Sequence, residues 1–326
     1  MTDTPVVKIS QLTKQFEDYS AVNAVDLEIH SGEVYGLIGP NGAGKTTLIR
    51  LLAMADSPTD GDIYIDGVPL MRGQANASLK QRIGFLPDDF PLYDDLSVSD
   101  YLEYFGQLYY LDPTELRSRV TEVLDLVNLE SKRHSLISGL SRGMKQRLSL
   151  ARTVIHRPLL LLLDEPVSGL DPIARIDYCK TIKRLQREGI TILISSHILS
   201  DLEDFCTTIG IMEQGQLVES GQLQSLYRRE GQQLMMTVLE KPDHLEVYLQ
   251  EHPLVQGYEQ LSPDDIGDAK LAVQGGKFVV SFSGSEDDGA ELLRVLITEG
   301  LRISEFHYKP ETLEDIFVRL GYQKTA

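Results

Sequence analysis

The residue types and spacing from Gly39 to Thr47 point to phosphate chemistry. This stretch contains three glycines, which permit backbone conformations that turn successive amide N–H groups inward toward an anion. A helix that begins near Lys45 would add the positive end of its dipole. The sequence therefore predicts a nucleotide-binding loop made of Gly39, Pro40, Asn41, Gly42, Ala43, Gly44, Lys45, Thr46 and Thr47.

Two side chains of this loop have specific roles in the prediction. Lys45 would reach the β- and γ-phosphates of the nucleotide, and the Thr46 hydroxyl would bind Mg²⁺. Apolar runs at 34–38 and 47–52 flank the loop. We therefore expect a buried strand that enters the loop and a helix that leaves it, which a chance glycine-rich turn would lack.

A second group of residues supplies carboxylates. Five consecutive leucines at 159–163 precede Asp164 and Glu165, a pattern typical of a buried strand. Asp164 would bind Mg²⁺, and Glu165 would orient or deprotonate the water that attacks the γ-phosphate. Taken alone, these residues indicate only a strand followed by an acidic turn. Beside a phosphate-binding loop, they favour phosphoryl transfer.

Composition and charge restrict the class of protein. The 326 residues carry a net charge of -18, which argues against a nucleic-acid partner because phosphate binding needs a basic surface. Cys179 and Cys206 have no metal-binding spacing, so we expect two reduced thiols. The first residues lack the pattern of a signal peptide, and polar residues interrupt every apolar run. We therefore expect a cytoplasmic protein that contacts a membrane only through a partner.

The order of patterns along the chain predicts two domains. Residues 1–222 alternate β-rich runs with helical patterns, typical of a mostly parallel sheet flanked by helices, with a mainly helical segment at about 94–156. Residues 223–326 contain Pro242, Pro253, Pro263 and an acidic, glycine-containing run at 284–289, and there we expect a smaller α+β domain. Its expected β-α-β-β-α-β order has strands at 232–239, 269–274, 277–283 and 301–308, and helices at 243–251 and 287–299.

Three further motifs resemble those of ABC ATPases. Residues 140–147, ahead of the leucine-rich strand, resemble the signature motif, 168–171 resemble the D-loop with Asp171, and 195–197 resemble the switch-histidine segment with His197. The resemblance covers residues 6–222 and implies a P-loop NTPase core of the ABC ATPase type with a helical subdomain. Residues 311–317 resemble the C-terminal ending of a subfamily whose ATPase is a separate chain that pairs with a membrane-spanning permease, often for export.

This resemblance implies a site that one chain cannot complete. In the family, two subunits hold two ATP molecules head to tail, so Ser141 and Gly143 would bind the γ-phosphate of the partner's nucleotide. Phe16 matches the aromatic position that stacks on adenine. A homodimer that closes around ATP and opens after hydrolysis would then drive the permease.

Three positions depart from the family pattern, one of them Met144, where glutamine is common. Asp88 stands where a glutamine usually contacts Mg²⁺ and the attacking water. A carboxylate can bind Mg²⁺ but cannot donate a hydrogen bond when ionised, so we expect slower or differently coupled turnover. Arg142 stands where glycine is common. It would either approach the partner's phosphates or face solvent, and we favour solvent.

The leading hypothesis is the ATP-hydrolysing subunit of a membrane exporter. A soluble ABC ATPase of translation or DNA repair is disfavoured by the single cassette, the lack of a long heptad insert and the acidic charge. A nucleotide-gated regulator with weak catalysis is motivated by Asp88 but disfavoured by Glu165 and His197. The aromatic residues between 88 and 110 are either core or, in part, the groove that receives a permease helix in the family.

Overall fold

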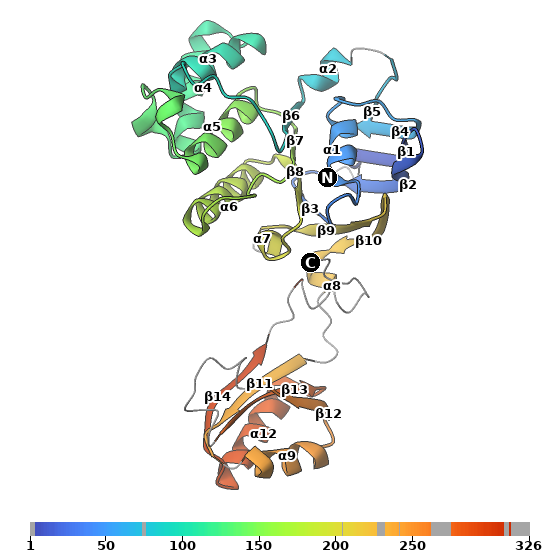
Figure 1. The fold of residues 1–326 in the computed structure, drawn as a ribbon, viewed down its shortest axis with the longest axis vertical. Coiled ribbons are helices and arrows are strands. Elements are labelled where there is room, and N and C mark those ends of the chain that lie inside the picture. Colours follow the sequence, from blue (N-terminus) through green and yellow to red (C-terminus); the bar gives the residue numbers. More distant parts are fainter. Residues whose placement is uncertain are drawn as a thin grey trace. The chain divides into compact units, whose positions relative to one another are not determined.

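The computed structural model of the chain describes residues 4–73, 76–203, 205–226, 232–240, 242–261, 275–309 and 313. The chain divides into two compact units, with the boundary between Gln224 and Ser225 (Figure 1). Among the described residues, no helix has the length and apolar character needed to cross a bilayer.

A six-stranded sheet forms the centre of the first unit, in the order β10-β9-β3-β8-β7-β6. All neighbouring pairs are parallel except β10 and β9, which are antiparallel. Parallel strands end at the same edge of a sheet, so residues that follow β3, β7 and β8 meet there. The strands are β3 (Val34–Ile38), β6 (Ile83–Leu86), β7 (Leu160–Leu163), β8 (Thr191–Ser196), β9 (Thr208–Glu213) and β10 (Gln216–Gln222).

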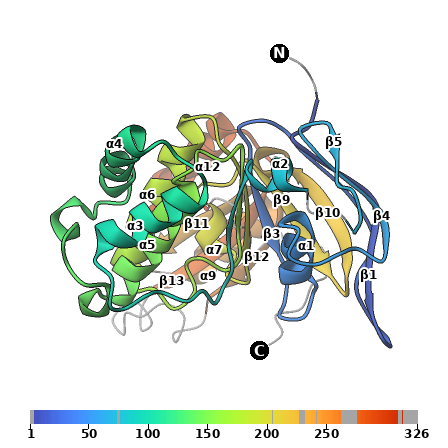
Figure 2. The same ribbon diagram turned by 90° about the horizontal axis from the view of Figure 1, so that it is seen from above.

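A second, antiparallel sheet lies on one side of this central sheet, and helix α1 (Lys45–Leu52) contacts strands of both sheets (Figures 1 and 2). Every residue of β3, β7 and β8 is buried, as expected for parallel strands covered on both faces. The strands of the second sheet, in the order β2-β1-β4-β5, are β1 (Val7–Phe16), β2 (Tyr19–Ile29), β4 (Asp60–Ile65) and β5 (Val68–Pro69).

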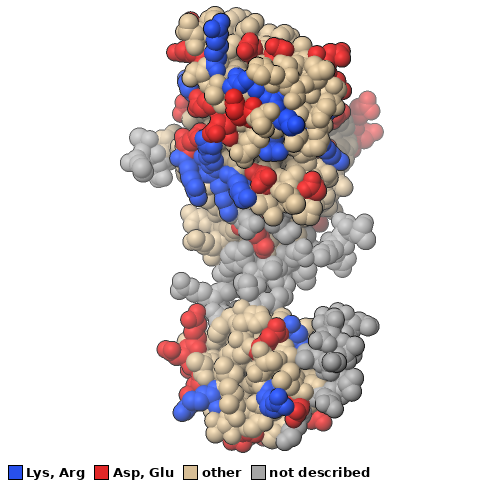
Figure 3. Space-filling model, turned by 90° about the vertical axis from the view of Figure 1, so that its left-hand side faces the viewer, with Lys and Arg blue, Asp and Glu red and all other residues tan. Residues whose placement is uncertain are grey.

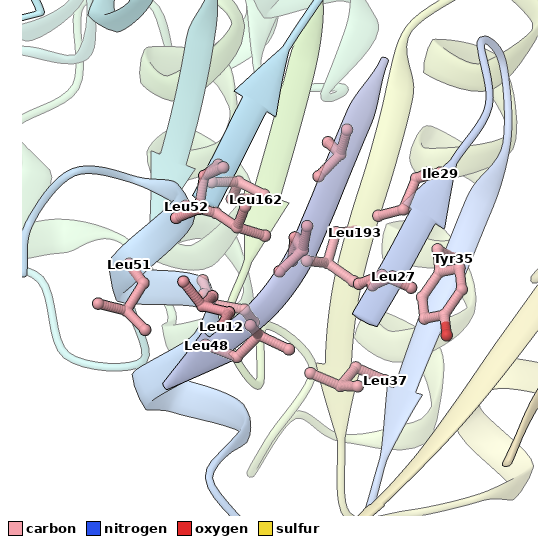
Figure 4. Close-up of a cluster of buried hydrophobic side chains, with 14 of the residues drawn as sticks. Leu12, Leu27, Ile29, Tyr35, Leu37, Leu48, Leu51, Leu52, Leu162 and Leu193 are labelled. Atoms are coloured by element: carbon pink, nitrogen blue, oxygen red, sulfur yellow. The ribbon is translucent and has the colours of Figure 1, made fainter. Parts of the chain in front are cut away.

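Apolar side chains of α1 anchor the loop that precedes this helix. Leu48 and Leu52 are fully buried in one cluster with Leu12 of β1, Leu162 of β7 and Leu193 of β8 (Figure 4). Burying each leucine contributes about 1.5–3 kcal/mol. Both sheets therefore hold the start of α1 in place.

Helices cover the other side of the central sheet in both ribbon views (Figures 1 and 2). They include most of the segment that we expected to be helical. The longer ones are α3 (Val98–Leu108), α4 (Pro113–Leu126), α5 (Arg142–Val154) and α6 (Pro172–Arg187). Short helices in this unit are α2 (Ala77–Lys80), η1 (Glu130–Lys132), η2 (Ile137–Gly139) and α7 (Ser200–Glu203), and α8 (Leu223–Leu226) spans the boundary at Gln224.

The helical face carries basic and acidic side chains next to one another (Figure 3). Arg184 of α6 pairs with Asp125 of α4 at 3.1 Å, and Lys145 of α5 pairs with Asp94 at 2.9 Å. Exposed ion pairs usually contribute less than about 1 kcal/mol each. These ion pairs therefore contribute little to the stability of the helical face.

The second unit has the β-α-β-β-α-β order expected from the sequence. The predicted strand at 269–274 lies outside the described residues, and β12 at Val255–Gln260, which we did not predict, follows the first helix instead. This strand is mostly exposed at the edge of the sheet, so its sequence lacks a clear apolar alternation. The elements are β11 (Gln232–Val238), α9 (Pro242–Glu251), β12, β13 (Gly276–Phe282), α12 (Glu286–Thr298) and β14 (Ile303–Lys309), with sheet order β12-β13-β11-β14.

Candidate nucleotide-binding site

The predicted phosphate loop connects β3 to α1, as its flanking apolar runs indicated. Gly44 has φ +105°, and a Cβ atom there would collide with Ala21 O. Gly42 has φ +81°, and its carbonyl accepts a hydrogen bond from the Tyr19 hydroxyl at 2.9 Å. Side-chain-bearing residues rarely adopt these conformations, so both glycines are required for the shape of the loop.

Lys45 is buried at the first position of α1. Its Nζ donates to Gly39 O at 2.7 Å and Pro40 O at 3.1 Å, and lies 3.6 Å from Glu165 Oε1. Burial lowers the pKa of Lys45, whereas the Glu165 carboxylate opposes that change. A poorly hydrated ammonium group beside the helix N-terminus suits the binding of an anionic phosphate.

Asp164, directly after β7, is only 1% exposed. Its Oδ1 accepts from Ser195 Oγ at 2.7 Å and from Thr46 Oγ1 at 3.2 Å. Burial raises the pKa of Asp164, and the two hydroxyl donors partly counter this effect. The charges of Glu165 and Asp88 also raise this pKa. A cation beside the carboxylate would relieve the cost of this buried negative charge.

The donor set at this position fits Mg²⁺. The Thr46 hydroxyl and the Asp164 carboxylate lie within 3.2 Å of each other, and both are hard oxygen ligands. Mg²⁺ commonly takes one or two protein oxygens and completes its shell with phosphates and water. These two residues would therefore hold the ion beside Lys45.

Glu165 and His197 face each other across the ends of β7 and β8. His197 Nδ1 lies 2.6 Å from Glu165 Oε2, and the Glu165 backbone N–H donates to Ser195 Oγ at 3.0 Å. Glu165 has φ +47°, a strained conformation for a residue with a side chain and one that often occurs at functional sites. The Glu165 carboxylate is thus fixed between an imidazole and the Lys45 ammonium group.

The described residues enclose a pocket of about 420 Å³ at this edge of the sheet. It brings together the phosphate loop, Asp88, Glu165 and His197 from four separate parts of the sequence. Gly39, Pro40 and Asp164 do not line it, although each contacts a residue that does. The lining residues are Tyr19, Ala21, Asn41, Gly42, Ala43, Gly44, Lys45, Thr46, Thr47, Asp88, Glu165, Ser168 and His197.

Phe16, the predicted adenine-stacking residue, does not line this pocket. Its ring is 45% exposed, and Lys14 Nζ lies 4.6 Å from the ring centroid. Tyr19 does line the pocket and was missed by the sequence prediction. Two exposed aromatic rings thus stand near the phosphate loop, and the only sequence signal for Tyr19 was its position three residues after Phe16.

Ser141 and Gly143, which we expect to act in trans, lie outside the pocket lining, and so does Asp171, which we expect to bind nucleotide. Ser141 caps α5 by accepting from Met144 N at 3.3 Å, and Asp171 caps α6 by accepting from Ala174 N at 2.9 Å. A Cβ atom on Gly143 would lie 2.9 Å from Ala174 Cβ. The first turns of α5 and α6 are therefore close neighbours.

Arg142 does not simply face solvent, which corrects the interpretation that we favoured. Although the residue is exposed, its guanidinium group donates to Ser168 O at 3.1 Å and contacts Gly169. The sequence indicates an exposed arginine but does not show that α5 lies beside the loop at 168–171, so this contact could not be predicted.

The aromatic residues between 88 and 110 include both buried and exposed rings. Tyr101 is buried, whereas Tyr93 and Tyr104 are each 44% exposed and pack against its neighbour Phe105. Tyr109 stacks on His156 with ring centroids 3.8 Å apart. The core interpretation therefore applies to Tyr101, whereas a permease groove at the exposed rings stays a prediction.

Comparison with known proteins identifies the family. Residues 22–168 match the ABC transporter family. The chain is 32% identical over 315 residues to the ABC transporter ATP-binding protein YxlF of Bacillus subtilis (strain 168), which covers 97% of this chain and 99% of that protein. The chain belongs to the ABC transporter ATP-binding proteins. This result confirms the resemblance stated from the sequence, and the chain is an ATP-binding ATPase of that family.

Two further similarities extend this result. The ABC ATPase is 30% identical over 318 residues to the Nod factor export ATP-binding protein I of Rhizobium meliloti (strain 1021), which covers 97% of this chain and 88% of that protein. It also resembles the dimeric structure of an ATP-binding cassette in a post-hydrolysis state bound to ADP and phosphate. That match has a TM-score of 0.60 and 27% identity, and it covers 67% of this chain and 98% of the other.

Proposed function

We propose that this ABC ATPase works as a homodimer that closes around two ATP molecules and drives a separate transmembrane permease in export. The observation that carries the proposal is the position of Glu165. Its carboxylate lies between His197 and Lys45, at 2.6 and 3.6 Å, on the wall of the pocket formed by the phosphate loop. This arrangement suits a base beside the γ-phosphate.

Each residue of the site has one task in this proposal. Lys45 binds the β- and γ-phosphates, and the glycine-rich backbone binds the remaining phosphate oxygens. Bound Mg²⁺, held by Thr46 and Asp164, would neutralise charge on the transferred phosphoryl group. Glu165 takes a proton from the attacking water, and His197 keeps the Glu165 carboxylate in position.

The positions of Ser141 and Gly143 support a site shared by two chains. Neither residue lines the pocket of its own chain, although Ser141 lies at a helix N-terminus, which is suited to anions. In a head-to-tail dimer they would reach the γ-phosphate held by the partner subunit, with Asp171 nearby. Loss of the γ-phosphate would then remove the contact that favours closure.

We also assign tasks to the two parts of the chain. Residues 1–222 would be the ATPase cassette, with its helical subdomain at about 94–156, and residues 223–326 would stabilise the dimer or regulate its opening. The permease would place the protein at the inner face of the cell membrane. Similarity to a Nod factor export protein supports export as the direction of transport.

Asp88 supports a second candidate, a nucleotide-gated regulator with weak catalysis. The carboxylate lines the pocket where the family usually has a glutamine, and its charge opposes ionisation of Asp164. A regulator would bind ATP and dimerise, but substitution of Glu165 would not change its turnover. The comparison of wild type with Glu165→Gln therefore separates the two functions.

Sedimentation velocity with the Glu165→Gln chain tests the shared site directly. With ATP and Mg²⁺, this variant should sediment as a dimer, and without nucleotide as a monomer. Adding Ser141→Ala should weaken the ATP-dependent dimer at least fivefold, since the hydroxyl would no longer reach the partner's phosphate. A monomer at every ATP concentration would contradict the proposal. Purification of tagged chain from membranes should yield a multi-spanning partner that raises its ATPase rate.

A further inference from the structure

Arg142 occupies the first position of α5, directly after Ser141. A cation at this end of a helix is unfavourable, because the helix dipole is positive there. Helix stability therefore does not explain an arginine at this position. Its contacts outside the helix offer a better explanation.

The guanidinium group of Arg142 contacts the loop that follows the Asp-Glu strand. It donates to Ser168 O at 3.1 Å. It also lies so close to Gly169 that a Cβ atom there would overlap three guanidinium atoms. Gly169 has φ +66°, so a glycine at this position both permits the turn and leaves room for the planar group.

This contact joins residues that serve two different nucleotides under the proposed function. Ser168 lines the pocket of its own chain, and its N–H donates to Glu165 O at 3.1 Å. Ser141 would act on the partner's nucleotide. Arg142, the neighbour of Ser141, thus connects to Glu165 through Ser168. A shift of the first turn of α5 would therefore be passed through Arg142 to the turn that carries Glu165.

We infer that Arg142 is a positioning residue that couples the signature motif to the turn between Glu165 and Gly169 within one chain. It needs no contact with a phosphate to do this. The inference rests on the proposed function for its catalytic consequence, but the contact itself can be tested in protein that holds no nucleotide. Glycine, which is common at this position in the family, could not make the contact.

Hydrogen exchange of the full-length, nucleotide-free protein tests the contact. In Arg142→Ala, the backbone amides of Ser168 and Leu170 should exchange at least threefold faster, because their turn loses the guanidinium group. Arg142→Lys should fall in between, since it keeps a donor without the planar group. Arg117→Ala, an exposed arginine of α4, is the matched control and should leave these amides unchanged. Unchanged exchange in Arg142→Ala overturns the inference, whether or not the protein hydrolyses ATP.

Steady-state kinetics of the same variants test the coupling. Arg142→Ala should lower kcat about tenfold and leave KM for ATP within twofold of wild type. The double variant Arg142→Ala/Glu165→Gln should dimerise with ATP within twofold of Glu165→Gln alone. Arg142→Lys should recover part of kcat. If Arg142→Ala instead weakens the dimer as much as Ser141→Ala, Arg142 acts on the partner's phosphate and the inference is wrong. If wild type neither turns over ATP nor dimerises, the proposed function fails, while the exchange result still decides the contact.

Discussion

Ser195, the fifth residue of β8, forms a short hydrogen bond to Asp164, the residue that follows β7. Ser195 Oγ donates to Asp164 Oδ1 at 2.7 Å and accepts from Glu165 N at 3.0 Å. One buried hydroxyl therefore holds both a proposed Mg²⁺ ligand and the backbone of the proposed base. Neighbouring residues of the ligands would thus set the geometry of hydrolysis as much as the ligands themselves.

The Ser195→Ala variant should be less stable and less active. It leaves the Glu165 amide without its Ser195 partner and removes the shorter of the two hydrogen bonds to Asp164 Oδ1, which costs about 1–3 kcal/mol in the free energy of unfolding. Turnover should fall about tenfold or more. Urea unfolding and ATPase assays measure the two effects. Ser149→Ala is a matched control, because this buried hydroxyl bonds only within α5, to Lys145 O at 3.0 Å. An equal loss in both variants would argue against a special role for Ser195.

The Asp88→Gln variant should change the rate of hydrolysis. It removes a negative charge from the pocket wall and supplies a hydrogen-bond donor for water. We expect kcat at saturating ATP and Mg²⁺ to rise severalfold, measured with and without the permease. The neighbouring exposed Asp89→Gln should have no such effect. Identical rates for wild type and Asp88→Gln under both conditions would refute the predicted effect of this carboxylate on turnover.

Measurements of nucleotide affinity can show whether Phe16 or Tyr19, the two exposed aromatic residues in question, stacks on adenine. If Phe16 stacks on adenine, Phe16→Ala should weaken ATP binding about twofold to tenfold, the range expected for one aromatic pair. Tyr19→Phe keeps the ring but removes the hydrogen bond to Gly42 O, so it should affect affinity less. Fluorescent ATP titration measures both. Wild-type affinity in Phe16→Ala, with a clear loss in Tyr19→Ala, would move the stacking role to Tyr19.

His156 should make the stability of the first unit depend on pH. Burial lowers the pKa of this imidazole to about 4, although Nε2 lies 3.0 Å from Ile83 O. The unfolded chain takes up a proton below about pH 6.5, whereas the folded chain does not until about pH 4. Stability is therefore full above pH 6.5 and falls as the pH drops toward 4.

Between pH 7 and pH 5 this loss should reach about 2 kcal/mol, from 1.36 kcal/mol per pH unit below 6.5. His156→Phe keeps a ring against Tyr109 and should lose less stability over this interval in urea unfolding. The exposed His134→Gln should behave like wild type. The same pH dependence in wild type and His156→Phe would contradict the assignment.

The phosphate loop and the Asp-Glu strand could be predicted because their chemistry is local. The glycines, Lys45 and Thr46 lie within nine consecutive residues, and an apolar strand directly precedes Asp164. Spacing and residue type alone therefore indicated their roles. In the structure Gly42, Gly44, Lys45 and Thr46 line one pocket, and Asp164 contacts Thr46. The roles themselves remain predictions.

Other features depend on contacts between distant parts of the chain. Ser195 meets Asp164 across 31 residues, and nothing in its local sequence distinguishes it from Ser196. Arg142 contacts Ser168, which is 26 residues further along the chain. This contact depends on how α5 packs beside the loop that precedes α6, which the sequence does not give. The exposed edge strand β12 was missed for a different reason, since its polar residues do not alternate with apolar ones.

The central claim is a hydrolytic site completed by two chains, with Glu165 as its base. The most direct test is the steady-state ATPase activity of the purified full-length chain at increasing protein concentration, with Glu165→Gln as the control. We predict a specific activity that rises with concentration and falls at least a hundredfold in the variant. Activity that is independent of concentration, or that persists in Glu165→Gln, would contradict this account.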